Sequence, residues 1–234
     1  MPEAFAALLF AHALADFVLQ TGWMAAHKRH PGALALHGLT IWGTAALATG
    51  GLSPWLVALA LVHLAIDIAK SLAPGGLAGF LADQAAHLVV LAALAPLIGP
   101  VWPQFPPATA LMALAAGLIL VTRAGGFAVG MMMARWESPA GQSEAGLSDG
   151  GLWIGLLERL MIFLLVLSGQ AQAIGYLIAA KSVLRFGTVG DDRRMSEYVI
   201  IGTLASITWA IAVSAGIVAL MRHLPPLGIP RLAP

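Results

Sequence analysis

Long apolar runs alternate with short polar or Pro/Gly-rich connections along the whole chain. About 20 apolar residues are needed for a helix to cross the hydrocarbon core of a bilayer, so the pattern predicts about eight spans, in a range of seven to eight. The predicted segments are 4–24, 33–50, 54–72, 80–98, 108–133, 151–168, 171–186 and 197–221. The sequence therefore predicts an all-α, polytopic helical bundle that forms a single membrane domain over residues 1–234.

Composition and charge support this class and suggest an orientation. Hydrophobic residues make up 59% of the chain and charged residues 10%, whereas soluble domains average about 25% charged residues. When the spans are threaded alternately, one side receives Lys28, Arg29, Lys70, Arg135, Arg185, Arg193 and Arg194, and the other receives Arg222 and Arg231. By the positive-inside rule the first side is cytoplasmic and both termini are periplasmic. We expect a multi-pass protein of the bacterial inner membrane, with membrane lipids as partners; the pattern does not determine whether it forms an oligomer. The chain has no basic patch of the kind that binds nucleic acid.

Ionisable side chains interrupt the first four apolar segments, which form the half of the domain over residues 1–100. They are His12, Asp16, His37, His63, Asp67, Asp83 and His87. Each such group costs roughly 2.5–3.5 kcal/mol at the centre of a membrane helix, so several together must face one another, a cavity or an ion. Residues four apart share one helix face, which aligns His12 with Asp16 and Gln20, His63 with Asp67, and Asp83 with His87.

Four histidines and three aspartates in one layer are typical of a centre for one or two metal ions. The chain has no cysteine, so thiolate ligands, disulfides and iron–sulfur clusters are excluded. We predict a divalent metal, with zinc first and iron or manganese as alternatives, bound by all seven residues. In the alternative arrangement one of the aspartates does not bind the metal but fixes the tautomer of a ligating imidazole. Gln20 and Lys70 are assigned to substrate binding. A structural hydrogen bond between helices is the competing interpretation of each histidine.

The half over residues 101–234 carries a second polar cluster of Glu158, Arg159, Lys181 and Arg185. Neighbours in sequence point in different directions on a helix, so Glu158 and Arg159 are expected to have different partners. The functional interpretation assigns Glu158 to proton transfer, Arg159 to an oxyanion, and Arg159, Lys181 and Arg185 to an anionic headgroup. The alternative is ion pairing between helices with snorkelling of the long side chains. Arg123 with Gly125 and Gly126 predicts a kink in the fifth span.

The motifs that carry these residues resemble a known family. They are His12-x3-Asp16-Phe17-x2-Gln20, His63-x3-Asp67-x2-Lys70, Asp83-Gln84-x2-His87 and Gly-x2-Ile-Gly-x2-Glu158-Arg159. Together they resemble an uncharacterised family of bacterial polytopic membrane proteins, a domain of unknown function, over most of the chain. The resemblance implies no reaction. The distribution of His and Asp over several helices is similar to that in intramembrane metal hydrolases of the alkaline ceramidase and adiponectin-receptor group. This chain lacks their His-x3-His pair.

The leading functional hypothesis is a metal-dependent membrane hydrolase that acts on a lipid or another amphiphile at the cytoplasmic leaflet. Metal-activated water would attack the substrate, Asp16 or Glu158 would serve as base, and Arg159 would stabilise the oxyanion. An oxidative di-iron enzyme fits the same ligands. A cation or proton-coupled transporter or channel is the alternative from another class. A b-type haem protein with two of His12, His37, His63 and His87 as axial ligands is the third.

Overall fold

The computed structural model describes residues 1–99, 101–136, 149–186 and 193–227, and within residues 184–186 it describes only the backbone. The chain folds as two compact units: unit 1 comprises Met1–Leu120 with Ile217–Pro234, and unit 2 comprises Val121–Gly216. All regular structure in the described ranges is helical. The predicted all-α class is therefore confirmed.

The helices of unit 1 begin with α1 (Pro2–Leu14), which continues as a π-helix, η1 (Ala15–Leu19). The others are α2 (Gly22–Ala26), α3 (Pro31–Thr49), α4 (Pro54–Leu72), α5 (Leu77–Leu94), the short 3-10 helix η2 (Ala95–Leu97) and α6 (Pro107–Ile119). A second π-helix, η3 (Leu120–Ala124), leads into unit 2, which contains α7 (Gly125–Met133), α8 (Gly150–Leu167), α9 (Ala173–Phe186) and most of α10 (Arg193–Met221).

Six helical stretches in the described ranges are long and apolar enough to cross a membrane. They are Pro2–Leu19, Pro54–Leu72, Leu77–Leu97, Pro107–Met133, Gly150–Leu167 and Arg193–Met221. The 19-residue helix α3 is not among them, and Ala173–Val183 is a shorter apolar helix. The chain is thus a multi-pass membrane protein, while the count of seven to eight spans and the periplasmic termini stay predictions.

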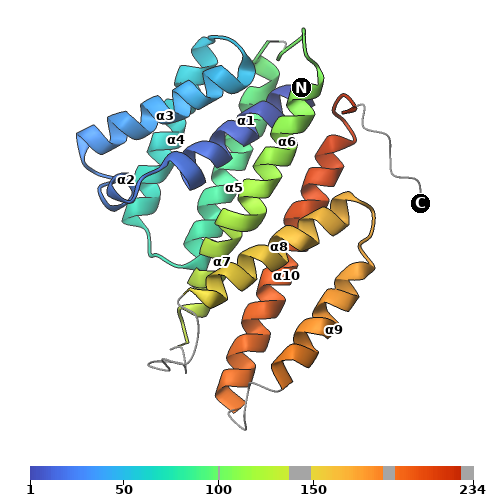
Figure 1. The fold of residues 1–234 in the computed structure, drawn as a ribbon. Helices are drawn as coiled ribbons and strands as arrows, with labels where there is room; N and C mark the ends of the chain where they lie inside the picture. Colours follow the sequence, from blue (N-terminus) through green and yellow to red (C-terminus); the bar gives the residue numbers. More distant parts are fainter. Residues whose placement is uncertain (100, 137–148, 187–192, 228–234) are drawn as a thin grey trace. The chain divides into compact units, whose positions relative to one another are not determined.

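Helix α1 is the central helix of unit 1. It contacts α3, α5 and α6, and in Figure 1 it lies between α3 and α6. Its buried positions are mostly alanine, for example Ala6, Ala7, Ala11 and Ala13. Small side chains let membrane helices approach closely without a cavity, so the alanines explain why α1 can be enclosed on several sides.

The helices α3, α4 and α5 follow one another along the chain, and each has one buried face. The buried positions are Ala33, His37, Ile41, Ala45 and Ala48 on α3; Leu56, Leu59, Ala60, His63 and Asp67 on α4; and Phe80, Asp83, His87 and Leu91 on α5. These spacings of three and four residues keep one helix face inward. The opposite faces carry apolar side chains such as Leu39, Leu61 and Val89, which are 63–68% exposed and suit contact with lipid. The predicted polar residues therefore point into unit 1.

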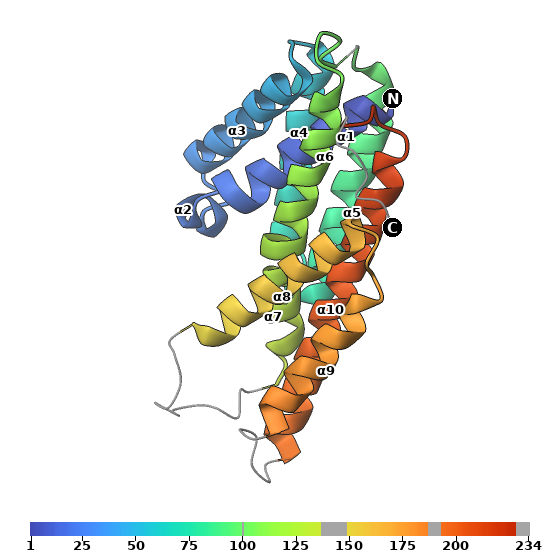
Figure 2. The ribbon, with the colours of Figure 1, turned by 45° about the vertical axis from the view of Figure 1, so that its right-hand side comes forward.

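The first predicted segment, 4–24, is not one continuous helix. Its α-helical hydrogen bonding widens to the π pattern over Ala15–Leu19, and Gln20 then adopts an extended backbone conformation with ψ 110°. Thr21 next caps α2 by accepting a hydrogen bond from the Met24 amide at 3.2 Å, and Figure 2 shows α2 close to the start of α3. The prediction that Gln20 extends the helical stripe of His12 and Asp16 was wrong, because the helix ends before it.

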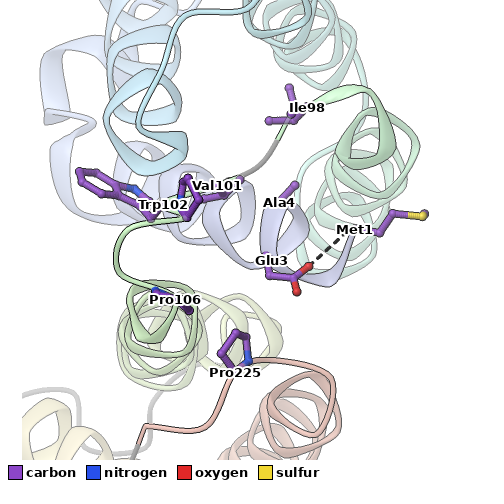
Figure 3. Close-up of a pocket in the computed structure, with 10 residues that line it drawn as sticks. Met1, Glu3, Ala4, Ile98, Val101, Trp102, Pro106 and Pro225 are labelled. Carbon is purple, nitrogen blue, oxygen red and sulfur yellow. Dashed lines mark hydrogen bonds and ion pairs between the residues drawn. The ribbon is translucent and has the colours of Figure 1, made fainter.

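The ends of the described chain meet where α1 begins. The Met1 ammonium group pairs with the Glu3 carboxylate at 3.2 Å, beside a pocket of about 440 Å³ that Trp102 and Pro225 also line (Figure 3). Trp102 donates to the Ala48 carbonyl oxygen at 2.8 Å and covers Gly50, whose φ of 72° ends α3 in the left-handed conformation that glycine favours. The lining contains neither histidine nor aspartate, so this pocket is separate from the cluster described next.

Candidate metal centre

Four helices of unit 1 each deliver a buried imidazole to one cluster. His12, His37, His63 and His87 are only 1–4% exposed and come from α1, α3, α4 and α5 in turn. Four of the six ring pairs are in contact, with centroids 4.0–5.4 Å apart. The cluster also contains Asp16, which lies in the π-helix η1. Single π turns inside α-helices occur frequently at functional sites.

Two imidazole nitrogens and two carboxylate oxygens form a closed ring of donor atoms. Asp16 Oδ1 lies 3.7 Å from His37 Nε2 and 3.2 Å from His63 Nε2. On the other side, Asp67 Oδ2 lies 3.1 Å from His37 Nε2 and 3.6 Å from His63 Nε2. Donors bound tetrahedrally to one zinc ion at normal bond lengths are about 3.3 Å apart. The four sides of the ring, 3.1–3.7 Å, are close to this spacing, and Asp16, His37 and His63 form a group of potential ligands.

These short contacts are not good hydrogen bonds. Asp16 Oδ1, His63 Nε2 and Asp67 Oδ2 are buried and have no hydrogen-bond partner among the described residues. A neutral imidazole has a single N–H, so His63 Nε2 cannot donate to two carboxylates at once. Buried polar atoms without partners are rare in native proteins and call for an explanation such as an ion.

Charge compensation differs among the three aspartates. Lys28 Nζ lies 2.5 Å from Asp67 Oδ1, and Lys70 Nζ lies 2.6 Å from Asp83 Oδ2. Asp16, whose side chain is 11% exposed, has only imidazoles around it, and no lysine or arginine in the described ranges pairs with it. An isolated buried carboxylate is costly. A cation at the cluster would compensate Asp16.

A second group of potential ligands shares Asp16 with the first. His12, Asp16 and His87 offer ligand atoms that lie within 4.8 Å of one another, as do Asp16, His37 and His63. His12 Nδ1 lies 3.6 Å from Asp16 Oδ2, the carboxylate oxygen that does not face His37 and His63. Five of the seven predicted ligands thus belong to these two groups, and Asp67 belongs to neither but contacts His37 and His63.

The remaining predicted site residues of unit 1 lie at the edge of the His/Asp cluster. Asp83 belongs to neither ligand group; its Oδ1 lies 3.7 Å from His87 Nδ1 while its Oδ2 binds Lys70. Gln20 Nε2 lies 3.3 Å from His37 Nε2, so its amide reaches the cluster despite the changed backbone. Lys70 also lies over the Phe80 ring at 5.4 Å. The substrate-binding roles of Gln20 and Lys70 stay predictions.

Sequence reasoning missed two participants, Lys28 and Gln84. Lys28 was counted only as a basic loop residue, yet its long side chain reaches Asp67. Gln84 Oε1 lies 3.2 Å from His12 Nε2, and Gln84 Nε2 donates to Asp83 Oδ2 at 3.1 Å. The signal for Gln84 was present, since it is a polar residue in an apolar span three positions before His87.

Unit 2 contains the Glu158 and Arg159 cluster. Lys181 Nζ donates to Glu158 Oε2 at 2.7 Å, which is the interhelical ion pair of the structural interpretation. Arg159 instead donates to Ser206 Oγ and to the Thr122 carbonyl oxygen, both at 3.2 Å. The two neighbours therefore have different partners, as predicted. The side chain of Arg185 lies outside the described part of the structure, and the catalytic and substrate-binding roles of this cluster stay predictions.

The π-helix η3 and nearby glycines accommodate Arg159. The π-helix η3 lies where a kink was predicted near Arg123, and it contains Thr122, an acceptor for the guanidinium. The kink itself stays a prediction. A Cβ on Gly125 would lie 2.7 Å from Trp209 Cδ1 and 3.0 Å from Arg159 Cδ. Gly125 is thus required for close packing rather than for an unusual backbone angle.

Gly125→Ala is expected to destabilise the protein by about 1–3 kcal/mol, because the added methyl group overpacks a tight contact. Gly130→Ala in the same helix meets nothing within 4 Å and is the matched control. Alanine should stabilise that position by about 0.5–1 kcal/mol. Thermal unfolding of both variants in one detergent checks the difference, and equal effects would contradict the packing described for Gly125.

The fold and cluster define the class: an all-helical, multi-pass membrane protein with a buried His/Asp cluster of metal-ligand type. Residues 4–111 match the model of a family described as "Protein of unknown function (DUF3307)". The match covers somewhat less than half of the chain, includes the whole His/Asp cluster, and ends before unit 2. Neither a curated protein nor a solved structure matches the chain.

Proposed function

We propose that this protein is a metal-dependent integral-membrane hydrolase of a lipid or other amphiphilic substrate. It acts at the cytoplasmic leaflet of the bacterial inner membrane and uses zinc, with iron or manganese as the alternative metals. The observation that carries the proposal is the environment of Asp16: a largely buried carboxylate among three imidazoles, without a lysine or arginine partner in the described ranges. A divalent cation satisfies the carboxylate charge and the imidazole lone pairs together.

The donor set supports a metal ion over a haem group. His37 and His63 supply nitrogen, and Asp16 and Asp67 supply oxygen, at spacings of 3.1–3.7 Å. Haem bound between two axial histidines needs their rings on opposite faces of a porphyrin. Most pairs of imidazoles in the cluster are instead in direct contact. A small ion fits this arrangement better than a macrocycle.

The proposed reaction is the addition of water across an ester, amide or phosphoester bond. A zinc ion lowers the pKa of its water enough to supply hydroxide near neutral pH, so no strong protein base is needed. With a metal ion held by Asp16, His37, His63 and Asp67, hydroxide would add to carbon or phosphorus as the bond to the leaving group breaks. The leaving oxygen or nitrogen would take up the proton that the water lost.

The first test is elemental analysis of the detergent-purified protein, with an absorption spectrum of the same sample. We expect at least one equivalent of zinc, iron or manganese and no Soret band. Protein that stays metal-free after incubation with each metal would overturn the proposal and favour ion or proton transport. A positive result justifies a screen for release of fatty acid, amine or phosphate from bilayer lipids.

His63→Ala is expected to weaken metal binding by more than about 100-fold, since loss of a direct ligand exceeds the 10–100-fold loss for an outer-shell partner. His27→Ala is the matched control, because that imidazole is exposed and stacks on Trp23 with centroids 5.4 Å apart. Metal content and thermal unfolding of both variants give the readout. Equal metal content in the two variants would remove His63 from the ligand set.

A further inference from the structure

Asp16 presents its two oxygens to two different groups of histidines. Its Oδ1 lies 3.2 Å from His63 Nε2 and 3.7 Å from His37 Nε2, whereas its Oδ2 lies 3.6 Å from His12 Nδ1. His87 belongs to the same group as His12. A carboxylate with one oxygen towards each of two ligand groups is arranged to bridge two ions, which in two-metal sites lie about 3.5–4 Å apart.

Hydrogen bonds determine which nitrogen of His12 carries the proton. The Lys70 ammonium group binds Asp83 Oδ2, so this carboxylate is an acceptor, and the Gln84 amide nitrogen donates to the same oxygen at 3.1 Å. Gln84 must therefore turn its carbonyl oxygen towards His12 Nε2, 3.2 Å away, which then carries the proton. The lone pair of neutral His12 is left on Nδ1, the atom that faces Asp16.

Asp83 also orients His87, through its backbone carbonyl group. His87 Nδ1 donates to the Asp83 carbonyl oxygen at 2.9 Å, which leaves the lone pair on Nε2. His12 Nδ1 and His87 Nε2 are both buried and have no hydrogen-bond partner in the described ranges. Metal-ligating histidines commonly have this arrangement: one ring N–H donates to a carbonyl group, and the other nitrogen is unprotonated and offers its lone pair to the metal.

We propose a second divalent-metal site formed by His12 Nδ1, His87 Nε2 and Asp16 Oδ2, with Asp16 bridging it to the ion held by His37, His63 and Asp67. Three protein ligands leave a coordination position for water or a substrate oxygen. Asp83 and Gln84 are positioning residues that set the two imidazoles. The inference rests on the proposed metal centre and adds that this centre is dinuclear.

The test is a titration of metal-stripped, full-length protein with Mn²⁺, followed by equilibrium dialysis and electron paramagnetic resonance. We expect two bound equivalents and the broadened signal of exchange-coupled ions. His87→Phe should bind one equivalent with the signal of an isolated ion. One isolated ion in the unmodified protein would overturn the second site and leave the proposed hydrolase intact, whereas no bound metal with Mn²⁺ or with Zn²⁺ would overturn both.

Gln84→Leu keeps the test decisive if His87→Phe does not fold. Loss of the amide frees His12 to change its tautomer, so affinity for the second ion should fall about 10–100-fold while affinity for the first is unchanged. Gln172→Leu is the control, because that glutamine is exposed and bonds only Gln170 at 3.4 Å in the described ranges. Equal loss of both ions in Gln84→Leu, or no loss of either, would contradict the proposed positioning of His12.

Discussion

Replacement of Asp16 by asparagine is expected to abolish metal binding and to reduce hydrolysis to background. Asp16 is the one residue common to both ligand groups, and its oxygens lie 3.2 Å from His63 and 3.6 Å from His12. An amide is neutral and offers a single weak ligand oxygen, so the ion at His12 and His87 loses its carboxylate ligand. The ion at His37 and His63 keeps only Asp67. We expect metal affinity to fall by more than about 100-fold, beyond the range for outer-shell changes.

Without metal, the same variant should be less stable than the unmodified protein. The Asp16 oxygens lie 3.2–3.7 Å from three imidazoles, and a protonated imidazole there forms an ion pair with the carboxylate, so the substitution removes its counter-ion. Metal-stripped Asp16→Asn should therefore unfold at a lower temperature than metal-stripped unmodified protein. Added zinc at 100 times its dissociation constant should stabilise only the unmodified protein, by about 2.7 kcal/mol.

Glu3→Gln is the matched control for Asp16→Asn, because Glu3 lies on the same helix and its side chain is 38% exposed beside the Met1 ammonium group. Metal content, unfolding temperature with and without zinc, and hydrolysis are measured on all three proteins. Zinc that stabilises Asp16→Asn as much as the unmodified protein would show that Asp16 is not a ligand.

Helical periodicity was enough to predict which residues of unit 1 face inward. His63 and Asp67 fall on the buried stripe of α4, and Asp83 and His87 fall on that of α5. Spacing along one helix cannot, however, show which neighbouring helix supplies the partner. The 3.1 Å contact between His37 and Asp67 depends on how α3 and α4 pack, and the sequence alone does not determine it.

Local backbone geometry was the other part that the sequence did not reveal. Nothing in the run around Asp16 signals a π turn, because π and α helices use similar residues. Lys28 was counted only as a basic charge on the cytoplasmic side, yet its flexible side chain reaches the buried Asp67 carboxylate. In unit 2 the divergence of Glu158 and Arg159 was predictable, since adjacent helical residues point in different directions.

Lys181→Met is expected to destabilise unit 2 by roughly 2–3 kcal/mol. The substitution leaves Glu158, whose side chain is 12% exposed, as a charge without its 2.7 Å partner. Breaking a fully buried pair costs about 3–5 kcal/mol, and the 22% exposure of Lys181 lowers that figure. Chemical unfolding in mixed micelles measures the change. Ser182→Ala is the neighbouring control, because Ser182 is exposed and, among the described residues, its hydroxyl bonds only the Ile178 carbonyl oxygen.

The double variant Glu158→Gln with Lys181→Met separates a structural role from a chemical one. Removing both charges eliminates the unpaired carboxylate, so most of the lost stability should return. If Glu158 transfers protons in the reaction, activity stays lost in the double variant although stability recovers. Recovery of both would make the pair purely structural. A double variant as unstable as Lys181→Met alone would contradict the ion pair itself, because the cost would then not come from the charge of Glu158.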